Sequence, residues 1–382
     1  MDARKTLETI WWAGVNRVRG DRAVAEALAD GKGEGVTHIA AVGKAASPMM
    51  RAALAACGPD LPALVVTKHG HGEAELSGHP NLTLIESGHP VPDQQSLEAG
   101  SALIDFVSKA GPEARLLLLV SGGASALAES LPGGMTLDGL QAMTQAMLAE
   151  GLDIHAINAK RKEISAIKGG KLLARFPGKS ALVLAISDVE GDDIAVIGSG
   201  IGMIPASRRT DDMDAEIIAS NAIAREACAR EADELGLEIT VSSENLYGDV
   251  FGIAADLAET VKAGAPGLYI FGGEPTVVLP EEPGEGGRNQ ALAVAMAREL
   301  DLMRDLPGMN DISVLAAGTD GSDGPTGSAG GYVTARDWDR VKGGASALAA
   351  ADSGSWLRKS GGLFVTGPTG TNVMDLMLVL KR

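Results

Sequence analysis

Short apolar runs alternate with amphipathic segments along most of the chain. The runs predict strands near residues 38–42, 63–70, 83–88, 115–120, 181–186 and 238–242. The segments between them have apolar residues at helical spacing, beginning with a helix of small residues after Gly43. This alternation is typical of βαβ units, in which helices cover both faces of a parallel or mixed sheet. We therefore predict an α/β protein.

The length and the distribution of glycine and proline predict two domains. A chain of 382 residues is longer than one ordinary core requires. A single large domain is the alternative. Glycine and proline become denser after about residue 240, following a charged stretch and a helix predicted over 215–235. We therefore predict an N-terminal domain over 1–240 and a C-terminal domain over 241–382.

Composition and charge narrow the range of functions. Apolar residues make up 45% of the chain and charged residues 22%, the balance of a globular protein. The net charge of −17 would repel nucleic acid and anionic membranes. No apolar run approaches the roughly 20 residues of a membrane span, and the N-terminus lacks the pattern of a signal peptide. Two cysteines fit a reducing compartment, so we predict a cytoplasmic protein with no nucleic-acid or membrane partner.

Two glycine-containing strand ends are candidate anion sites. Lys44 follows Gly43 at the end of the first strand, in AVGKAA. The segment LLLLVSGGASAL places five small residues between a buried strand and a predicted helix: Ser121, Gly122, Gly123, Ala124 and Ser125. Small residues let backbone N–H groups approach a phosphate, and a helix N-terminus adds partial positive charge. The motif matches neither the P-loop nor the dinucleotide fingerprint, and a plain tight turn is an equal alternative.

Charged residues at other strand ends and loops add candidates in the first domain. Lys168 precedes two glycines in SAIKGG, within a basic segment that otherwise predicts a solvated helix. Asp188 follows the run ALVLAIS, and Asp192 lies four residues later. Phosphoryl transfer needs one carboxylate to orient or deprotonate the attacking hydroxyl and others to hold Mg²⁺. The alternative for Asp188 is that it caps a turn.

The second domain carries the densest set of polar residues in glycine-rich turns. Arg288 and Asn289 follow GEGG at the start of a predicted helix, where a guanidinium could grip a carboxylate or phosphoryl group. Asp320 and Asp323 lie in AAGTDGSDGPTG, and Glu274 lies in the GGE turn. Each acidic residue alone would ordinarily be a turn residue that bonds its own backbone.

Histidines and serines suggest no competing chemistry. His69 and His71 are two residues apart in KHGHGE and His89 lies in SGHPVPD, but no third metal ligand has a suggestive spacing. We predict surface-loop roles for them. The chain has no Gly-x-Ser-x-Gly elbow, which disfavours acyl transfer.

Eight sequence blocks occur in an order that resembles one known family. They are AVGKAA, SGGASAL, NAKRKEISAIKGGKLL, ISDVEGDD, GGEPTV, GEGGRNQALA, AAGTDGSDGPT and TGPTGTNVMDL. Together they resemble the glycerate 2-kinase family, whose C-terminal part is called the MOFRL domain, over nearly the whole chain. Members of that family are ATP- and Mg²⁺-dependent kinases of D-glycerate that produce 2-phosphoglycerate. Many similar sequences carry the older label hydroxypyruvate reductase.

The resemblance implies a fold and raises individual candidates. The implied fold has two three-layer α/β/α domains, the N-terminal one Rossmann-like, with the site in an inter-domain cleft. Lys44 and Arg288 match positions that the family uses on substrate and transferring phosphate, SGGAS matches its phosphate loop, and Asp188 matches an acidic cleft residue. With the residue patterns, this predicts catalytic residues Lys44, Asp188 and Arg288, and nucleotide or phosphate contacts from Ser121, Gly122, Gly123, Ala124, Ser125 and Lys168. It also predicts substrate contacts from Glu274, Asn289 and Asp320, and metal ligands Asp192 and Asp323.

Two departures from the family pattern concern the substrate. Residues 197–209 read IGSGIGMIPASRR where a Gly-Pro-Thr segment and a later Pro-Asp are usual, and Gly327 stands where an Asp is common. A kinase of a related hydroxy acid is therefore an alternative. So are an NAD(P)H-dependent hydroxypyruvate reductase, disfavoured because no Gly-x-Gly-x-x-Gly turn is found, and a non-catalytic sugar-acid-binding protein. A homodimer stays open.

Overall fold

The computed structural model describes residues 2–149, 154–208 and 212–382. It divides into two compact units, one of which is continuous, Arg19–Ser220, while the other combines Met1–Val18 with Asn221–Arg382. The predicted boundary near residue 240 therefore differs from the structure. Helix α1 (Ala3–Arg17) packs against α10 (Asn221–Glu234) and two strands of the C-terminal sheet. The sequence pattern identifies an apolar face on α1 but does not identify the sheet that covers it.

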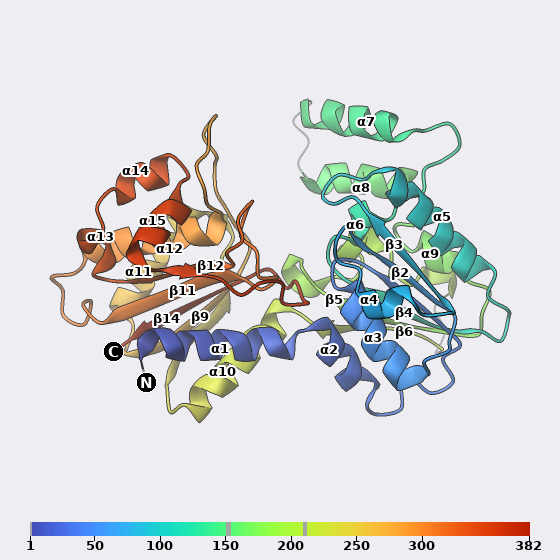
Figure 1. The fold of residues 1–382 in the computed structure, drawn as a ribbon, viewed down its shortest axis with the longest axis horizontal. Coiled ribbons are helices and arrows are strands. Elements are labelled where there is room, and N and C mark those ends of the chain that lie inside the picture. Colours follow the sequence, from blue (N-terminus) through green and yellow to red (C-terminus); the bar gives the residue numbers. More distant parts are fainter. Residues whose placement is uncertain (1, 150–153, 209–211) are drawn as a thin grey trace. The chain divides into compact units, whose positions relative to one another are not determined.

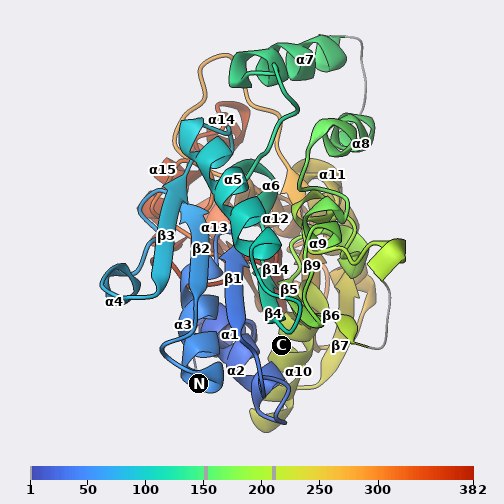
Figure 2. The same cartoon turned by 90° about the vertical axis from the view of Figure 1, so that its right-hand side faces the viewer.

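The continuous unit is built on a six-stranded parallel sheet. The strands are β1 (His38–Val42), β2 (Ala63–Lys68), β3 (Leu82–Ser87), β4 (Arg115–Val120), β5 (Ser180–Ile186) and β6 (Met213–Ala219). Their order is β3-β2-β1-β4-β5-β6, and every neighbouring pair is parallel. Figure 2 shows them side by side in this order. This is the strand order of doubly wound sheets that bind ligands at the point where the order reverses.

Helices cover both faces of this sheet. The helices of this unit are α2 (Gly20–Leu28), α3 (Ala46–Cys57), α4 (Ala74–Ser77), α5 (Gln94–Ser108), α6 (Ala124–Leu127), α7 (Leu137–Ala149), α8 (Ile154–Ile164) and α9 (Lys171–Ala174), with 3-10 turns at Glu190–Asp192, Ile197–Gly200 and Ala206–Arg208. Helix α7 packs on α8 instead of on the sheet. One core joins Ala40, Leu64 and Leu118 to Leu103 of α5 and Leu172 of α9. Helix α3 packs on β1, β2 and β4 and against α2. The alternation of strand side chains thus fills two layers, as expected for strands buried on both faces.

Strand β6 corrects a prediction. Residues from 215 onward were predicted as helix, whereas Met213–Ala219 forms the edge strand beside β5, and the helix begins at Asn221. The segment MDAEIIA mixes acidic and apolar residues, which is compatible with either element in isolation. Pairing with β5 decides the outcome, because an edge strand tolerates charge on its open side.

The second unit contains a mixed six-stranded sheet. Its strands are β7 (Ile239–Glu244), β9 (Gly267–Gly273), β11 (Ile312–Gly318), β12 (Gly330–Thr334), β13 (Leu363–Phe364) and β14 (Asp375–Lys381). The order is β13-β12-β11-β14-β9-β7, with β7 and β9 parallel and the other pairs antiparallel. A separate parallel pair joins β8 (Gly248–Asp249) to β10 (Pro275–Thr276). Strand β14 is therefore central, although it is the last strand in the sequence.

Helices also cover both faces of the mixed sheet. One layer contains α11 (Val250–Ala263), α12 (Arg288–Leu302), α13 (Asp337–Arg340), α14 (Gly344–Ala349) and α15 (Ser353–Ser360), and the other contains α1 and α10. Figure 1 shows α1 and α10 below this sheet and α12 and α15 above it. Ile10, Trp11 and Val15 of α1 are fully buried. Trp11 packs edge-to-face on Phe364 with ring centroids 5.0 Å apart.

None of the helices in the described residues is both long enough and apolar enough to cross a bilayer.

Candidate functional site

The first group of candidate residues lies where the strand order of the parallel sheet reverses. Strands β1 and β4 are neighbours there, and β1 is followed by Gly43 and Lys44 while β4 is followed by Ser121, Gly122 and Gly123. In open α/β sheets, ligands bind outside the carboxyl ends of the strands at such a point. The structure thus brings Lys44 and the SGGAS segment to one edge of one sheet.

Backbone hydrogen bonds lock these two loops together. Lys44 N donates to Gly122 O at 2.9 Å, and Ala45 N donates to the Ser121 hydroxyl at 3.1 Å. Gly43 has φ +135°, and a Cβ at that position would lie 2.1 Å from Ser121 Oγ and 2.5 Å from Ser121 O. Only glycine fits there, because both the conformation and the space exclude a side chain.

The SGGAS loop offers backbone donors rather than a helix dipole. Helix α6 after the loop spans only Ala124–Leu127, so it contributes little of the macrodipole that the sequence suggested. Within the described chain, the N–H groups of Gly122 and Gly123 have no hydrogen-bond acceptor. Adjacent unpaired N–H groups are suited to binding an anion.

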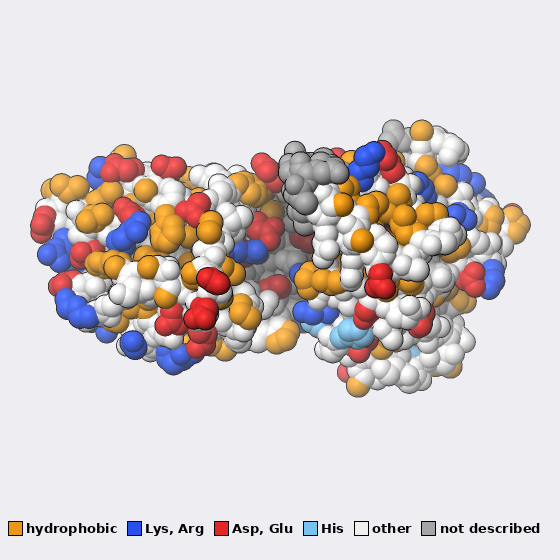
Figure 3. Space-filling model, turned by 90° about the horizontal axis from the view of Figure 1, so that it is seen from above, with side chains coloured by type: hydrophobic (Ala, Val, Ile, Leu, Met, Phe, Trp, Pro, Cys, Tyr) orange, Lys and Arg blue, Asp and Glu red, His pale blue; other side chains and the backbone are white. Residues whose placement is uncertain are grey.

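A lysine and a histidine meet over Gly123. An ideal Cβ on Gly123 would lie 3.2 Å from Lys44 Cγ and 3.1 Å from His89 Nε2, so both side chains cover the loop. Burial, with the charges of Lys44 and Lys68, lowers the pKa of His89 to about 4. His89 is therefore neutral near pH 7 and leaves Lys44 as a cation beside the loop. Figure 3 shows pale-blue histidine side chains beside a blue basic one on this unit.

The atypical segment that begins at Ile197 contacts the same loop through Ser199. Ser199 has φ +59°, and its hydroxyl lies 2.8 Å from that of Ser125. Ser199 O and Gly200 O accept hydrogen bonds from Gly169 N and Gly170 N at 3.0 and 2.9 Å. The residues that depart from the family pattern are therefore neighbours of the predicted phosphate loop.

Lys168 does not have the predicted position for a phosphate ligand. Its ammonium is fully buried and forms an ion pair with the fully buried carboxylate of Glu129. Ser165 Oγ also donates to Glu129 at 2.5 Å. Burial lowers the pKa of Lys168, and the Glu129 carboxylate opposes that shift. The lysine neutralises an internal carboxylate, which does not favour the predicted phosphate contact.

Asp188 and Asp192 lie one strand further along the parallel sheet. Asp188 follows β5, the neighbour of β4, and Asp192 ends the turn Glu190–Asp192 with φ +53°. Both side chains are partly exposed. They are thus at the same sheet edge as the SGGAS loop, with β5 next to β4.

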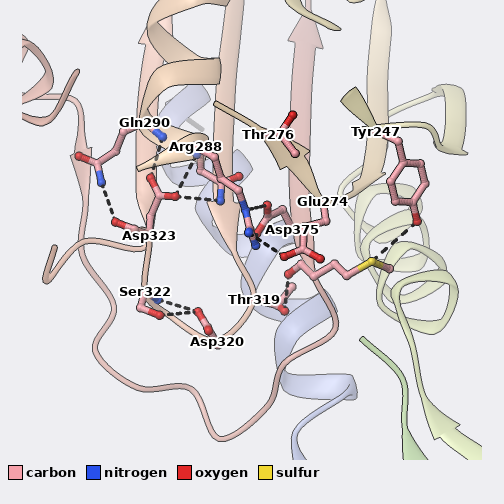
Figure 4. A network of polar contacts seen from close by, with 12 residues as sticks. Tyr247, Glu274, Thr276, Arg288, Gln290, Thr319, Asp320, Ser322, Asp323 and Asp375 are labelled. Carbon is pink, nitrogen blue, oxygen red and sulfur yellow. Dashed lines mark hydrogen bonds and ion pairs between the residues drawn. The ribbon is translucent and has the colours of Figure 1, made fainter. Parts of the chain in front are cut away.

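The second group of candidates gathers at one edge of the mixed sheet. Gly318 pairs with Asp375, which pairs in turn with Gly273. The carboxyl ends of β9 and β11 therefore lie beside the amino end of β14. Glu274 and Asp320 extend from the first two strands, and α12 begins with Arg288 nearby (Figure 4).

Two carboxylates of different burial hold Arg288. Its Nε and Nη2 donate to the two oxygens of Asp375 at 2.6 and 3.2 Å, and its Nη1 donates to Glu274 Oε1 at 2.7 Å. The Asp375 side chain is 1% exposed, that of Glu274 49%, and that of Arg288 34% (Figure 4). The guanidinium is thus fixed along one edge by a bidentate pair and partly open along the other.

The charges at this edge shift one another's ionisation. Burial raises the pKa of Asp375 to about 6, and the Arg288 guanidinium limits that rise. Burial alone would lower the pKa of Arg288, but the carboxylates of Asp375 and Glu274 raise it above its usual value. Arg288 is therefore cationic at any working pH.

The Asp323 carboxylate caps the N-terminus of helix α12. Its Oδ1 accepts from Asn289 N at 3.0 Å and its Oδ2 accepts from Gln290 N at 2.8 Å. These are N–H groups of the first helical turn, which need acceptors. Asn289 is buried beside the same carboxylate, so the cap occupies Asp323 and shields Asn289. This cap does not favour the predicted role of Asp323 as a metal ligand, which stays a prediction.

The remaining residues at this edge form turns. Asp320 Oδ1 accepts from Ser322 N at 2.8 Å and from its hydroxyl at 2.9 Å, and a Cβ on Gly318 would lie 3.4 Å from it and 3.3 Å from Asp375 Oδ1. The Thr319 hydroxyl donates to Met374 O at 2.6 Å and accepts from Val373 N. Asp320 is thus partly exposed and lies near the ion pair of Arg288 with Asp375. Among the described residues, no group of three His, Cys, Asp or Glu side chains could hold a metal by itself.

Three residues at these edges were not selected from the sequence: Asp375, His89 and Ser199. Asp375 had a usable signal, since it is a lone carboxylate directly before the apolar run LMLVL in a block that resembles the family. His89 was predicted as a surface-loop residue, and its position over Gly123 depends on tertiary structure.

Comparisons with known proteins agree with the blocks in the sequence. Residues 6–232 match the family described as a domain of unknown function (DUF4147), and residues 267–375 match the MOFRL family. The chain is 34% identical to D-glycerate 2-kinase from Thermotoga maritima, over 94% of each chain. It is 33% identical to an Agrobacterium vitis protein provisionally named hydroxypyruvate reductase, over 100% of this chain and 95% of that one.

A solved structure has the same fold. The crystal structure of glycerate kinase from Thermotoga maritima aligns over 99% of both chains with a TM-score of 0.87 and 31% sequence identity. The similarity thus extends over both sheets and both groups of candidate residues. The chain belongs to the glycerate 2-kinase family, with a MOFRL domain in its C-terminal part.

Proposed function

We propose that this protein is a kinase that transfers the γ-phosphoryl group of ATP to the 2-hydroxyl of D-glycerate, forming 2-phosphoglycerate and ADP. The observation that carries the proposal is the guanidinium of Arg288, held along one edge by buried Asp375 and one-third exposed. Such a fork matches carboxylate and phosphoryl oxygens. The family, whose relatives include a D-glycerate 2-kinase, supplies the substrate class.

The phosphate-binding part of the proposal rests on Lys44 and the SGGAS loop. The N–H groups of Gly122 and Gly123 and the Lys44 ammonium would contact phosphate oxygens, and the neutral His89 beside them would add no charge. Arg288 would bind the substrate carboxylate or the transferring phosphoryl group. Phosphoryl transfer depends mainly on such positioning and charge stabilisation.

Asp188 is the proposed base. It would accept a hydrogen bond from the 2-hydroxyl and take its proton as the oxygen–phosphorus bond forms and the bond to ADP breaks. Its position after β5, the neighbour of β4, supports this role because the SGGAS loop follows β4 at the same sheet edge. Replacement by Asn should remove most turnover and leave nucleotide binding.

Mg²⁺ would stabilise the charge on the transferring phosphoryl group. A nucleotide-bound Mg²⁺ needs only one or two protein carboxylates because phosphates and water supply the other ligands. This suits the described residues, which lack a three-ligand cluster. We assign the protein contribution to the β5 loop, with Asp192 as the ligand.

A coupled ADP-release assay with ATP and Mg²⁺ tests the proposal. D-glycerate should support turnover, L-glycerate and hydroxypyruvate should support little, and Lys44→Ala should lose most of it. Lys109→Ala is the matched control, because Lys109 is an exposed lysine paired within its own helical turn. ADP release from none of the hydroxy acids would refute the kinase assignment.

A reductase is the second candidate, and the β3-β2-β1-β4-β5-β6 order favours it because dinucleotides bind to such sheets. The turn after β1 reads AVGKAAS and lacks the glycine fingerprint that lets a pyrophosphate approach. Oxidation of NADH or NADPH by hydroxypyruvate, measured beside the ADP assay, would favour the reductase. Cytoplasmic localisation and a homodimer stay predictions, which cell fractionation and light scattering would test.

A further inference from the structure

Glu274 and Asp375 have different relations to Arg288. Asp375 is buried and takes two N–H groups of the guanidinium, whereas Glu274 takes one and its side chain is half exposed. Separating a buried bidentate ion pair costs much free energy, because it would leave a charge without a partner in the interior. An exposed single contact is worth little, since water replaces it readily. The contact between Arg288 and Asp375 is therefore the lasting one, and the contact between Arg288 and Glu274 opens more easily.

The backbone on both sides of Glu274 is held in place. Gly273 is the last residue of β9 and pairs with Asp375, and Pro275 begins β10 and pairs with Gly248. Gly273 also packs against the backbone of Leu246, which a Cβ would meet at 2.9 Å. Glu274 can thus leave Arg288 by rotating its side chain, without a change in the fold.

The Nη1 of Arg288 is consequently the part of the guanidinium that an incoming anion would reach first. We propose that Glu274 is a specificity-determining residue that competes with the anionic group of the substrate for Nη1 of Arg288 and rotates away when that group binds. An anion must then displace the single hydrogen bond of Glu274, which favours groups that bind the guanidinium through two oxygens, such as a phosphoryl group or a bidentate carboxylate. The inference rests on the proposed function only in taking Arg288 as an anion-binding residue.

Titration of the full-length protein with inorganic phosphate tests the competition directly. Glu274→Gln should bind phosphate about two- to fivefold more tightly than the wild type, the range set by exposed ion pairs. Glu285→Gln is the matched control, because Glu285 is 48% exposed and pairs with Arg358 on the same unit, compared with 49% for Glu274. The control should bind phosphate like the wild type.

A shorter carboxylate separates competition from simple charge repulsion. Glu274→Asp keeps the negative charge but has one methylene fewer with which to reach Nη1, so competition predicts tighter phosphate binding than in the wild type. Repulsion alone predicts no change in this variant. The proposal is overturned if Glu274→Asp behaves like the wild type, or if Glu274→Gln gains no more than Glu285→Gln.

The kinetic measurement is kept separate from the binding measurement. In the ADP assay, Glu274→Gln should lower the KM for the substrate whose anion binds Arg288 and leave kcat within about twofold. If the wild type phosphorylates no glycerate, the proposed function fails, but the phosphate titration still decides the role of Glu274.

Discussion

Asp375 is a carboxylate that must be charged to do its work and yet is buried in the sheet. It begins the central strand β14, and its two oxygens receive the Nε and Nη2 of Arg288. Burial raises its pKa to about 6, so the charge is present at neutral pH and is lost in mild acid. The orientation of Arg288 depends on that charge.

We predict that kcat/KM falls below about pH 6, as Asp375 takes up a proton and releases the guanidinium. The pKa is raised on folding, so ionisation of this group lowers stability as pH rises from about 4 to about 6. Its protonation therefore does not destabilise the fold, and the acid loss should reflect orientation. A pH–rate profile checks this, with circular dichroism at each pH.

Asp375→Asn is the companion variant. It should have low activity at every pH and no acid limb near pH 6, whereas Glu285→Gln should keep both the activity and the limb. An unchanged limb in a folded Asp375→Asn protein would show that another group titrates.

How far the sequence predicts single residues depends on whether their roles are local. The sequence identifies Lys44 and the SGGAS loop by glycines at strand ends, and Arg288 by the two glycines that precede a predicted helix. Lys168 has the same local signal, but its role depends on Glu129, which lies 39 residues away. Asp375 lies 87 residues from Arg288. Partners so distant along the chain leave no local pattern, so these pairings needed the structure.

At the scale of elements, two turns determine how the site loops meet. The turn after β1 passes so close to the turn after β4 that residue 43 has no room for a side chain. The cap of α12 comes from Asp323, in a loop 34 residues after Asn289. Most of the predicted strands and helices agree with the structure, because the spacing of apolar residues along the chain depends directly on the type of element. The cap was missed because it depends on residues distant in sequence.

Gly43→Ala should destabilise the protein strongly. A residue with φ +135° costs about 1–3 kcal/mol in strain for an L side chain, and the new Cβ would also overlap Ser121. Gly111→Ala is the control in the same unit, since a Cβ there meets nothing within 4 Å. Urea unfolding of both variants is the measurement. Equal midpoints would contradict the close contact between the two turns.

Asp323→Ala should cost about 1–2 kcal/mol of stability, because two N–H groups of the first turn of α12 lose their acceptor. Asp323→Asn keeps one acceptor oxygen, so its stability should lie between that of the wild type and that of Asp323→Ala. Thermal unfolding measures this, and the Mg²⁺ dependence of turnover should be unchanged in Asp323→Asn. A stable variant with a much greater Mg²⁺ requirement would restore Asp323 as a metal ligand.

At the scale of the whole molecule, one unit is continuous and the other is assembled from both ends of the sequence. In the sequence, residues 19–220 separate α1 from the other residues of its unit, 221–382. The buried side of α1 includes Trp11, and Thr371 Oγ1 donates to Val18 O at 2.6 Å where the chain leaves the unit. The rise in glycine and proline near residue 240 could not reveal that α1 belongs to the second unit, because composition carries no information on which segments are in contact.

We predict that residues 19–220 fold as an independent fragment and that residues 221–382 do not. Adding residues 1–18 through a short glycine–serine linker to Asn221 should restore cooperative unfolding, because it supplies the buried face of α1. The linker variant with Trp11→Ala is the control and should unfold at a lower temperature. A cooperative transition in residues 221–382 alone would contradict the assignment of α1.

The central position of β14 has a consequence for biosynthesis. The strand in the middle of the mixed sheet, between β11 and β9, is synthesised after the other five, so this sheet cannot close until residues 375–381 have been translated. At about 5–20 residues per second, α1 waits on the order of tens of seconds with Trp11 exposed, while the continuous unit has time to fold. A ribosome that stops before residue 375 would leave a gap at the centre of the sheet, and both strands beside the gap would be open to pairing with another nascent chain.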